Sequence, residues 1–105
     1  MRRQLRFTDE AEAQLRATAS DGSKKGLLKQ VRKTLGLLEI DARHPGLHTH
    51  EYASLKGVNG ERIWETHAQD ATPGAYRVFF HYGPDEGKTG ARVPVMTIVT
   101  ITPHP

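Results

Sequence analysis

Acid–base side chains and a cation recur at alternate positions in two neighbouring segments of the sequence. Glu65 and His67 lie two residues apart in the first segment, and Arg77 and His81 lie four apart in the second. In an extended strand, residues separated by two or four project from the same face. Glutamate and histidine can take up and release protons, and an arginine can stabilise a negatively charged transition state. The two segments therefore carry the parts of an acid–base site with an anion clamp.

The positions between these residues are mostly apolar, which predicts a second, buried face. These intervening residues are Trp64, Tyr76, Val78, Phe80 and Tyr82. We expect them to pack under the helices of the fold, because they form the more continuously apolar set. That arrangement leaves Glu65, His67, Arg77 and His81 together on the open face of a sheet.

A second group of histidines offers a different chemistry. His44, His48 and His50 lie close together beside Glu51, and His48 and His50 would share one face of a strand. Such a group could hold zinc or nickel. It lacks a cysteine or carboxylate at the spacing of known zinc motifs, and we therefore expect no metal and no cofactor.

The composition is that of a folded protein of 105 residues, with 36% hydrophobic and 26% charged residues. This length fits one domain, residues 1–105. The chain has no cysteine, which excludes disulfide frameworks, thiolate zinc sites and cysteine nucleophiles. It shows no signal-peptide stretch, and its longest apolar-rich run, Val93–Ile101, is too short to cross a bilayer. We expect a cytoplasmic protein with no membrane partner.

Positive charge gathers in the first half of the chain. The net charge is +3, and residues 1–50 hold ten of the 15 lysines and arginines. Five of them crowd into ten positions, namely Lys24, Lys25, Lys29, Arg32 and Lys33. Such a basic patch favours a phosphate backbone or an acidic protein partner, although a helix face exposed to solvent can carry the same pattern.

The first half of the chain predicts a short strand and two helices. Residues 3–7 are expected to form the strand, and Thr8 caps a first helix that runs to about Ser20. A second helix is expected over 24–42, ending before a Pro-Gly pair that cannot continue it. Its apolar stripe recurs at helical spacing through Leu27, Val31, Leu35 and Leu38.

The second half predicts strands. Segments 62–69, 75–82 and 92–102 are rich in residues that favour strands, and 47–55 is expected to form an irregular one. Turns are expected at 57–60, 70–74 and 83–90, and such short connections imply antiparallel pairing. The order predicts an α+β fold: a short N-terminal strand, a helical hairpin, and an antiparallel sheet of about four strands with the helices on one face.

A family resemblance follows from two of these strands. After the helical hairpin, Ile63-Trp64-Glu65 and then Ala75-Tyr76-Arg77-Val78-Phe79-Phe80 resemble the RelE/ParE superfamily of bacterial toxins. Its members commonly carry a Trp-Glu-Leu-Arg strand followed by a Tyr-Arg-Val-x-Tyr strand, and here His67 stands where an arginine is common. The resemblance spans nearly the whole chain. It implies a toxin of a type II toxin–antitoxin system that either cleaves mRNA at the ribosome or inhibits DNA gyrase.

The ribonuclease reading assigns roles to the candidate residues. His67 or Glu65 would take the proton from a ribose 2′-hydroxyl, and His81 or His104 would protonate the leaving oxygen. Arg77 would clamp the phosphate. Flanking phosphates and a stacked base would be held by Lys56, Arg62 and either Tyr82 or Phe79.

Two alternatives stay beside this reading. Glu65 and Arg77 could form only a cross-strand ion pair. The protein could also be a non-catalytic gyrase inhibitor, or an inactive toxin fold kept for binding. Either way, the resemblance and the basic first half lead us to expect an acidic antitoxin, which would pack over the basic helices or the open sheet face. The ribonuclease, acting without a metal, is the function that we expect.

Overall fold

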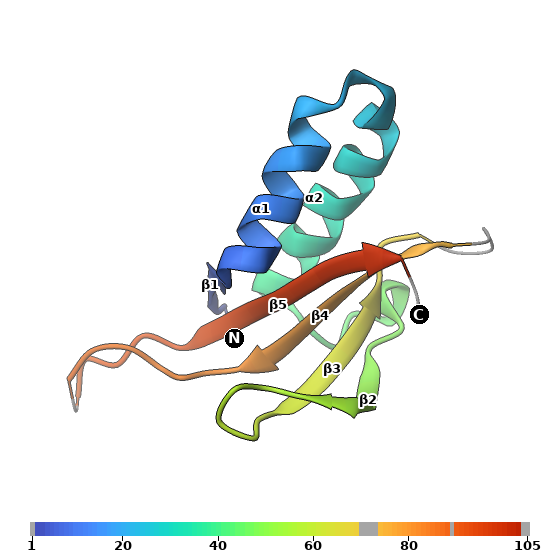
Figure 1. The fold of residues 1–105 in the computed structure, drawn as a ribbon. Helices are drawn as coiled ribbons and strands as arrows, with labels where there is room; N and C mark the ends of the chain where they lie inside the picture. The colour runs from blue at the N-terminus through green and yellow to red at the C-terminus, as the bar shows by residue number, and fades with distance from the viewer. Residues whose placement is uncertain (1, 70–73, 89, 104–105) are drawn as a thin grey trace.

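The computed structural model describes residues 2–69, 74–88 and 90–103, and its helices lie on one side of a twisted sheet (Figure 1). The helices are α1 (Asp9–Ser20) and α2 (Lys25–Ile40), joined by a 3-10 turn, η1 (Gly22–Lys24). The α+β class predicted from the sequence is confirmed. The strands are β1 (Gln4–Phe7), β2 (His50–Lys56), β3 (Arg62–His67), β4 (Tyr76–Tyr82) and β5 (Val95–Pro103), with a second 3-10 turn, η2 (Pro45–Leu47), before β2.

The sheet has five strands and is mixed rather than antiparallel. Its strand order is β1-β5-β4-β3-β2, and the strands that follow the helices pair antiparallel. The expected four-stranded sheet is corrected by β1, which pairs in parallel with β5. Parallel strands need a long connection, and here most of the chain separates the two. Local sequence patterns therefore carry no sign of this pairing.

The helices form where their caps and apolar stripes predict. The Thr8 hydroxyl accepts a hydrogen bond from the Ala11 amide (3.1 Å) at the start of α1 and donates one to the Val99 carbonyl (2.6 Å). The second helix ends at Ile40, two residues before its expected end, because Asp41 already takes an extended conformation. None of the described helices is long and apolar enough to span a membrane.

The main core lies between the helices and one face of the sheet. The buried residues of this core are Ala11, Val31, Leu35, Leu38, Leu47, Val78, Phe80, Met96, Ile98 and Ile101. Burying a leucine or phenylalanine of this kind contributes about 2 kcal/mol to folding. Trp64 and Tyr76 pack against the cluster. The strand alternation thus placed these aromatic side chains on the correct side of the sheet.

Three of the expected strand boundaries need correction. The segment expected as a strand over 47–55 begins as η2, and β2 starts only at His50 because Pro45 and Gly46 favour a tight turn. The strand expected over 62–69 ends at His67, and the one expected over 92–102 starts at Val95. The turn expected at 70–74 lies mostly outside the described residues.

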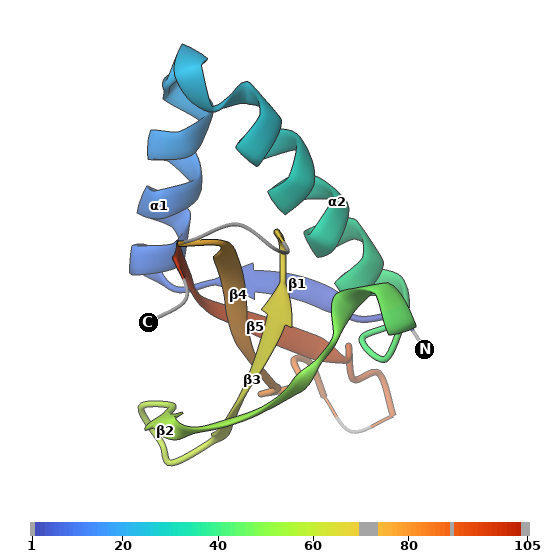
Figure 2. The ribbon, with the colours of Figure 1, turned by 90° about the vertical axis from the view of Figure 1, so that its right-hand side faces the viewer.

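The opposite face of the sheet is covered rather than open. Ile63 and Phe79, which project away from the main core, are 0% and 2% exposed. Part of this face is covered by β2, because the ring of Tyr52 contacts that of Phe79, with centroids 5.1 Å apart. Figure 2 shows β2 as a long curved strand at the edge of the sheet, beside β3. The candidate residues on this face therefore differ widely in exposure.

Candidate functional site

The register of β3 against β4 brings part of the expected site together. His67 lies opposite Arg77, and Glu65 lies opposite Phe79, all on the face turned away from the helices. On the other side of β3, His50 of β2 lies opposite Glu65. The predicted sharing of one face by Glu65, His67 and Arg77 agrees with this register. Glu65 and Arg77, considered as an alternative cross-strand ion pair, are not directly opposite one another, because Phe79 occupies the position opposite Glu65.

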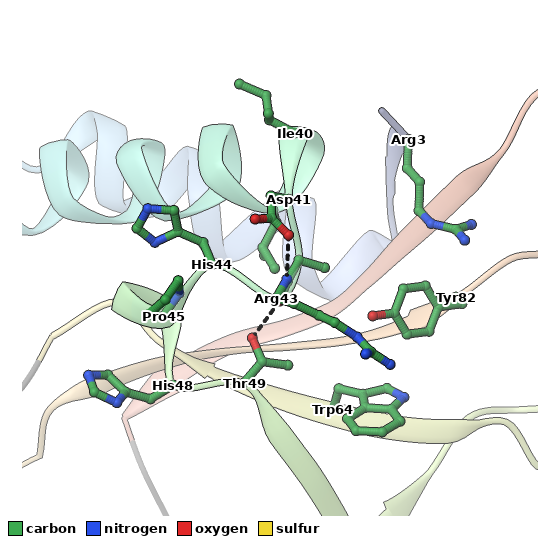
Figure 3. Close-up of a pocket in the computed structure, with 12 residues that line it drawn as sticks. Arg3, Ile40, Asp41, Arg43, His44, Pro45, His48, Thr49, Trp64 and Tyr82 are labelled. Atoms are coloured by element: carbon green, nitrogen blue, oxygen red, sulfur yellow. Dashed lines mark hydrogen bonds between the residues drawn. The ribbon is translucent and has the colours of Figure 1, made fainter. Parts of the chain in front are cut away.

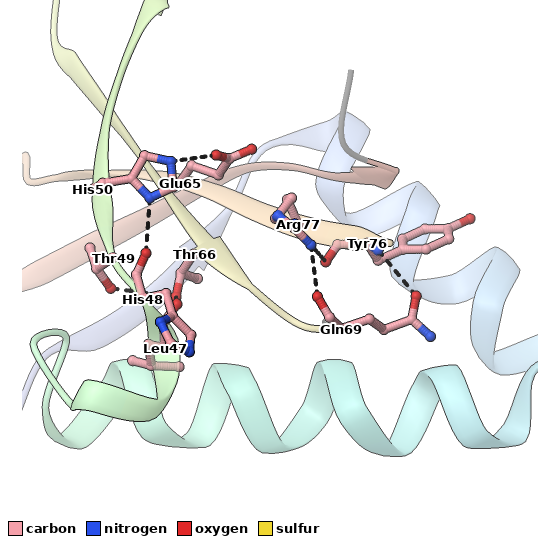
Figure 4. A network of polar contacts seen from close by, with 9 residues as sticks. All are labelled: Leu47, His48, Thr49, His50, Glu65, Thr66, Gln69, Tyr76 and Arg77. Atoms are coloured by element: carbon pink, nitrogen blue, oxygen red, sulfur yellow. Dashed lines mark hydrogen bonds and ion pairs between the residues drawn. The ribbon is translucent and has the colours of Figure 1, made fainter. Parts of the chain in front are cut away.

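His50 and Glu65 form the closest contact of this face. The Nε2 atom of His50 lies 2.6 Å from Oε1 of Glu65, whose side chain is only 1% exposed, while the imidazole is 50% exposed (Figure 4). The other ring nitrogen, Nδ1, lies 2.9 Å from the carbonyl oxygen of His48. Because a carbonyl only accepts, Nδ1 carries a hydrogen. Both ring nitrogens of His50 therefore have a polar contact, which fixes the orientation of the imidazole.

Two further imidazoles, those of His48 and His67, lie beside this pair. The ring of His67 lies 5.0 Å from that of His48 and 6.0 Å from that of His50, measured between centroids. We call His48, His50, His67 and Glu65 the histidine cluster. The cluster combines exposed proton-exchanging groups with one buried carboxyl group, which is the composition that general acid–base catalysis uses.

The position of His48 is set by its backbone. This residue ends η2 in the left-handed conformation, with φ 51°, which costs about 1 kcal/mol or more for a residue that has a Cβ. The segment is held against β3 by Thr66, which is fully buried and donates to the Leu47 carbonyl at 2.7 Å. Thr49 adds a hydrogen bond to the Ala42 carbonyl at 2.8 Å. These contacts hold the His48 ring beside His67.

Arg77 is anchored at the end of β4 by backbone carbonyls. One terminal nitrogen donates to the carbonyl of Gln69 (2.7 Å) and, at 3.3 Å, to that of Tyr76, as Figure 4 shows. Its Nε atom is buried and has no hydrogen-bond partner among the described residues. The guanidinium group is permanently charged. It therefore supplies a fixed positive charge on the strand position next to His67.

His81 lies apart from the histidine cluster. It is four residues from Arg77 along β4, roughly 13 Å at the rise of a strand. Its side chain is 9% exposed, with Nε2 at 3.9 Å from Glu61 and Nδ1 at 3.1 Å from the Tyr82 carbonyl. The structure therefore corrects the expectation that His81 is open to solvent. His104 lies outside the described residues.

Lys56 and Arg62 lie opposite one another at the far end of the β2–β3 pair. Arg62 donates two hydrogen bonds to Glu51, at 2.9 and 2.6 Å, and holds the pKa of that carboxyl group below its ordinary value. Neither cation reaches the histidine cluster. Tyr82 lines a separate cleft on the helix side of the sheet.

From the sequence, His48 and His50 were candidates only as metal ligands. Among the described residues, no three histidine, aspartate or glutamate side chains are arranged to hold a metal ion. The remaining member of that trio, His44, accepts a hydrogen bond from the Gly46 amide at 3.0 Å and so caps η2. The histidine cluster forms because of the register of β2 against β3. Local sequence patterns do not encode this register, so the cluster could not be predicted from them.

Comparison of the chain with models of protein families, with curated proteins and with solved structures finds no match. The resemblance to RelE/ParE toxins, which was based on short strand motifs, therefore stays a prediction.

Proposed function

We propose that this protein is an endoribonuclease that cleaves mRNA without a metal, acting in the cytoplasm as the toxin of a type II toxin–antitoxin pair. The observation that carries the proposal is the histidine cluster. The rings of His50 and His67 meet edge to face with centroids 6.0 Å apart, and His50 contacts the buried carboxyl group of Glu65 at 2.6 Å. Cleavage of RNA by its own 2′-hydroxyl needs this combination of acid and base.

In the proposed reaction, His67 removes the proton from a ribose 2′-hydroxyl. The 2′-oxygen then attacks phosphorus, a bond to that oxygen forms, and the bond from phosphorus to the 5′-oxygen breaks. His50 gives its Nε2 proton to the leaving 5′-oxygen as the contact of Nε2 with Glu65 opens, while the contact of Nδ1 with the His48 carbonyl keeps the ring in place. The products are a 2′,3′-cyclic phosphate and a 5′-hydroxyl end, so atoms and electrons balance without a co-reactant.

Arg77 supports the same step electrostatically. Extra negative charge develops on the phosphate oxygens as the 2′-oxygen attacks, and a fixed cation beside the phosphate lowers the energy of that state. The backbone carbonyls of Gln69 and Tyr76 hold the side chain in one orientation. A cation that is already in position needs no rearrangement when the reaction begins.

The toxin role is supported by the basic side chains on α2 and at the end of the turn η1 that precedes it. Lys24, Lys25, Lys29, Arg32 and Lys33 are all exposed. Exposed like charges at this density attract an acidic protein or a phosphate backbone. We propose an acidic antitoxin as the partner of this surface, with the ribosome and its mRNA as the target of the free toxin.

The test measures cleavage of a labelled single-stranded RNA by the purified protein in the presence of EDTA. We expect a 2′,3′-cyclic phosphate product and no cleavage of the same strand with a 2′-deoxyribose at the scissile position. His67→Ala should lower kcat by about a hundredfold or more. His81→Gln serves as a matched histidine control and should keep the wild-type rate, with thermal unfolding used to show that both variants are folded.

Ribosome-bound mRNA is the second substrate, tested by induced expression in a bacterial host. Growth arrest with cleaved mRNA, relieved by His67→Ala and by Arg77→Ala, supports the proposal. Arrest with intact mRNA would contradict it and favour a gyrase inhibitor or another non-catalytic role. Failure to cleave both free and ribosome-bound RNA would also overturn it.

A further inference from the structure

A cleft of about 700 Å³ opens on the helix side of the sheet, away from the buried face of the histidine cluster (Figure 3). It lies between the end of α2, the turn η2 and the ends of β3 and β4. Its volume is in the range of small-molecule sites, about 300–1,000 Å³. Two arginines and two aromatic residues give the cleft its character: Arg3, Arg43, Trp64 and Tyr82.

The aromatic wall consists of Trp64 and Tyr82. Their ring centroids lie 6.2 Å apart at an angle of 69°. Tyr82 is 37% exposed, and Trp64 is half-buried with its ring part of the cleft wall. Aromatic surface that is open in a cleft can stack on another planar ring, and stacking of a nucleobase is worth about 1–3 kcal/mol.

The arginines place positive charge beside this wall. The guanidinium of Arg3 lies over the Tyr82 ring, 4.9 Å from its centroid. The side chain of Arg43 extends across the cleft toward Trp64 and Tyr82 (Figure 3). Its backbone amide donates to Asp41 at 3.0 Å. Within the part of the chain that the structure describes, its guanidinium makes no hydrogen bond or ion pair, so all its donors are available to a ligand.

We propose that this cleft is a nucleotide-binding subsite. The base stacks on Trp64 with Tyr82 at its edge, and the phosphate is held by Arg43, with the charge of Arg3 beside it. A nucleotide has a partner for each kind of side chain in the cleft. Its phosphate oxygens accept hydrogen bonds from guanidinium groups, and its planar base stacks on an aromatic ring. A simple anion would leave the aromatic wall uncovered, and a neutral ring would leave the guanidinium of Arg43 without a partner, whereas Arg3 already lies 3.9 Å from Asp85.

The subsite adjoins the histidine cluster through His48. This residue lines the cleft, and its ring lies 5.0 Å from that of His67. Trp64 and His67 are three residues apart in β3, roughly 10 Å along the strand. If the proposed ribonuclease function holds, on which this step rests, the cleft takes an unpaired base of a strand that passes His48 at the β2 edge of the sheet to reach the rest of the histidine cluster on the opposite face. The substrate class is then single-stranded RNA.

The test uses Trp64, which is the only tryptophan of the chain and therefore reports on the cleft through intrinsic fluorescence. The full-length protein is titrated with AMP, with adenosine and with inorganic phosphate. We expect saturable quenching by AMP at millimolar concentration or below, and weaker binding of adenosine and of phosphate. Arg43→Gln should weaken AMP binding by about tenfold, the value of one hydrogen bond to a charged group.

Arg16→Gln is the matched control, because it removes the same charge from an exposed position in α1. It should change AMP binding by less than about twofold. An equal loss in both variants would reveal general charge attraction and overturn the subsite. Binding of inorganic phosphate as tight as that of AMP would also overturn it, as would the absence of saturable quenching.

The subsite and the ribonuclease can fail separately, because AMP is not cleaved. Saturable AMP binding without RNA cleavage would keep the subsite and remove the proposed activity. RNA cleavage with no AMP binding would do the reverse. Where both hold, Arg43→Gln should raise KM with little change in kcat, whereas His67→Ala should lower kcat.

Discussion

The imidazole of His50 and the carboxyl group of Glu65 meet at 2.6 Å across the β2–β3 pair, one partner half-exposed and the other buried. A carboxyl group with 1% exposure needs a hydrogen-bonded partner to remain in the interior. The imidazole satisfies that need while its other nitrogen is held by the His48 carbonyl. The same contacts that make the burial of Glu65 tolerable also fix the orientation of the half-exposed His50 ring.

The first prediction separates the acid from the base. A leaving group that departs without protonation removes the need for a general acid. An RNA in which sulfur replaces the bridging 5′-oxygen should therefore be cleaved by His50→Ala at nearly the wild-type rate. Unmodified RNA should be cleaved about a hundredfold more slowly by that variant.

His67→Ala is the matched comparison, because the base is needed for both substrates. It should be impaired on the sulfur-substituted RNA as well. Single-turnover rates with the two substrates measure the difference. Equal losses on both substrates for His50→Ala would show that His50 is not the acid.

Glu65→Gln tests whether the buried carboxyl group acts through His50. An amide keeps the shape of the side chain but cannot share the proton in the same way. We expect kcat on unmodified RNA to fall by about tenfold or more while KM stays near its wild-type value. Near-normal cleavage of the sulfur-substituted RNA would place the loss at the acid step. A wild-type kcat for this variant would remove Glu65 from the mechanism.

Thr66→Val tests how the segment that carries His48 is held. The hydroxyl of Thr66 is buried and donates to the Leu47 carbonyl at 2.7 Å. Valine fits the same space but leaves this carbonyl without its donor, which costs about 1–3 kcal/mol. Urea unfolding should show that loss. An unchanged midpoint would mean that the segment finds another donor.

Replacing a glycine by alanine should have opposite effects on stability at Gly87 and at Gly36. Gly87 has φ 95°, and a Cβ there would meet the Ala91 carbonyl oxygen at 2.7 Å. Gly87→Ala should therefore destabilise the protein by about 1–3 kcal/mol. Gly36 lies in α2, where a Cβ meets nothing within 4 Å, and Gly36→Ala should stabilise by about 0.5–1 kcal/mol. Thermal unfolding of both variants checks the signs, and the same sign in both would refute the argument.

The sequence predicted what repeats locally and missed what depends on distant pairing. The period of two in the third and fourth strands placed Trp64 in the core and His67 on the other face, because alternation is a property of each strand alone. The contact between His50 and Glu65 depends on the register of β2, which is irregular between Glu51 and Lys56. No local pattern encodes that register. The parallel pairing of β1 with β5 could not be predicted for the same reason.

The burial of the candidate face follows the same rule. Glu65 was expected in solvent because its strand neighbours alternate in polarity. It is buried because His50 and Tyr52 lie over that face, and they come from β2, whose register the sequence does not predict. The cleft could not be predicted either, since it joins Arg3, Arg43 and Tyr82 from three distant segments.

The last prediction concerns acid and the β2–β3 hairpin. Hydrogen bonds from Arg62 lower the pKa of Glu51, and backbone amides, including that of Asn59, lower the pKa of Glu61. Both carboxyl groups therefore bind protons less readily in the folded protein than in the unfolded chain. Their contribution to stability is complete above the ordinary glutamate pKa of about 4.3 and is lost as the pH falls through the lower folded values.

Urea unfolding at a series of pH values from neutral down to the acid range measures this loss. The unfolding free energy of the wild type should decrease as the pH falls below about 4.3. Glu51→Gln and Glu61→Gln should each start lower at neutral pH and decrease less, because each has already given up one of the two contributions. Salt should reduce the Glu51 effect, which is mainly an ion pair with the exposed Arg62, more than that of Glu61, which accepts backbone amides. Parallel curves for all three proteins would show that these carboxyl groups do not stabilise the hairpin.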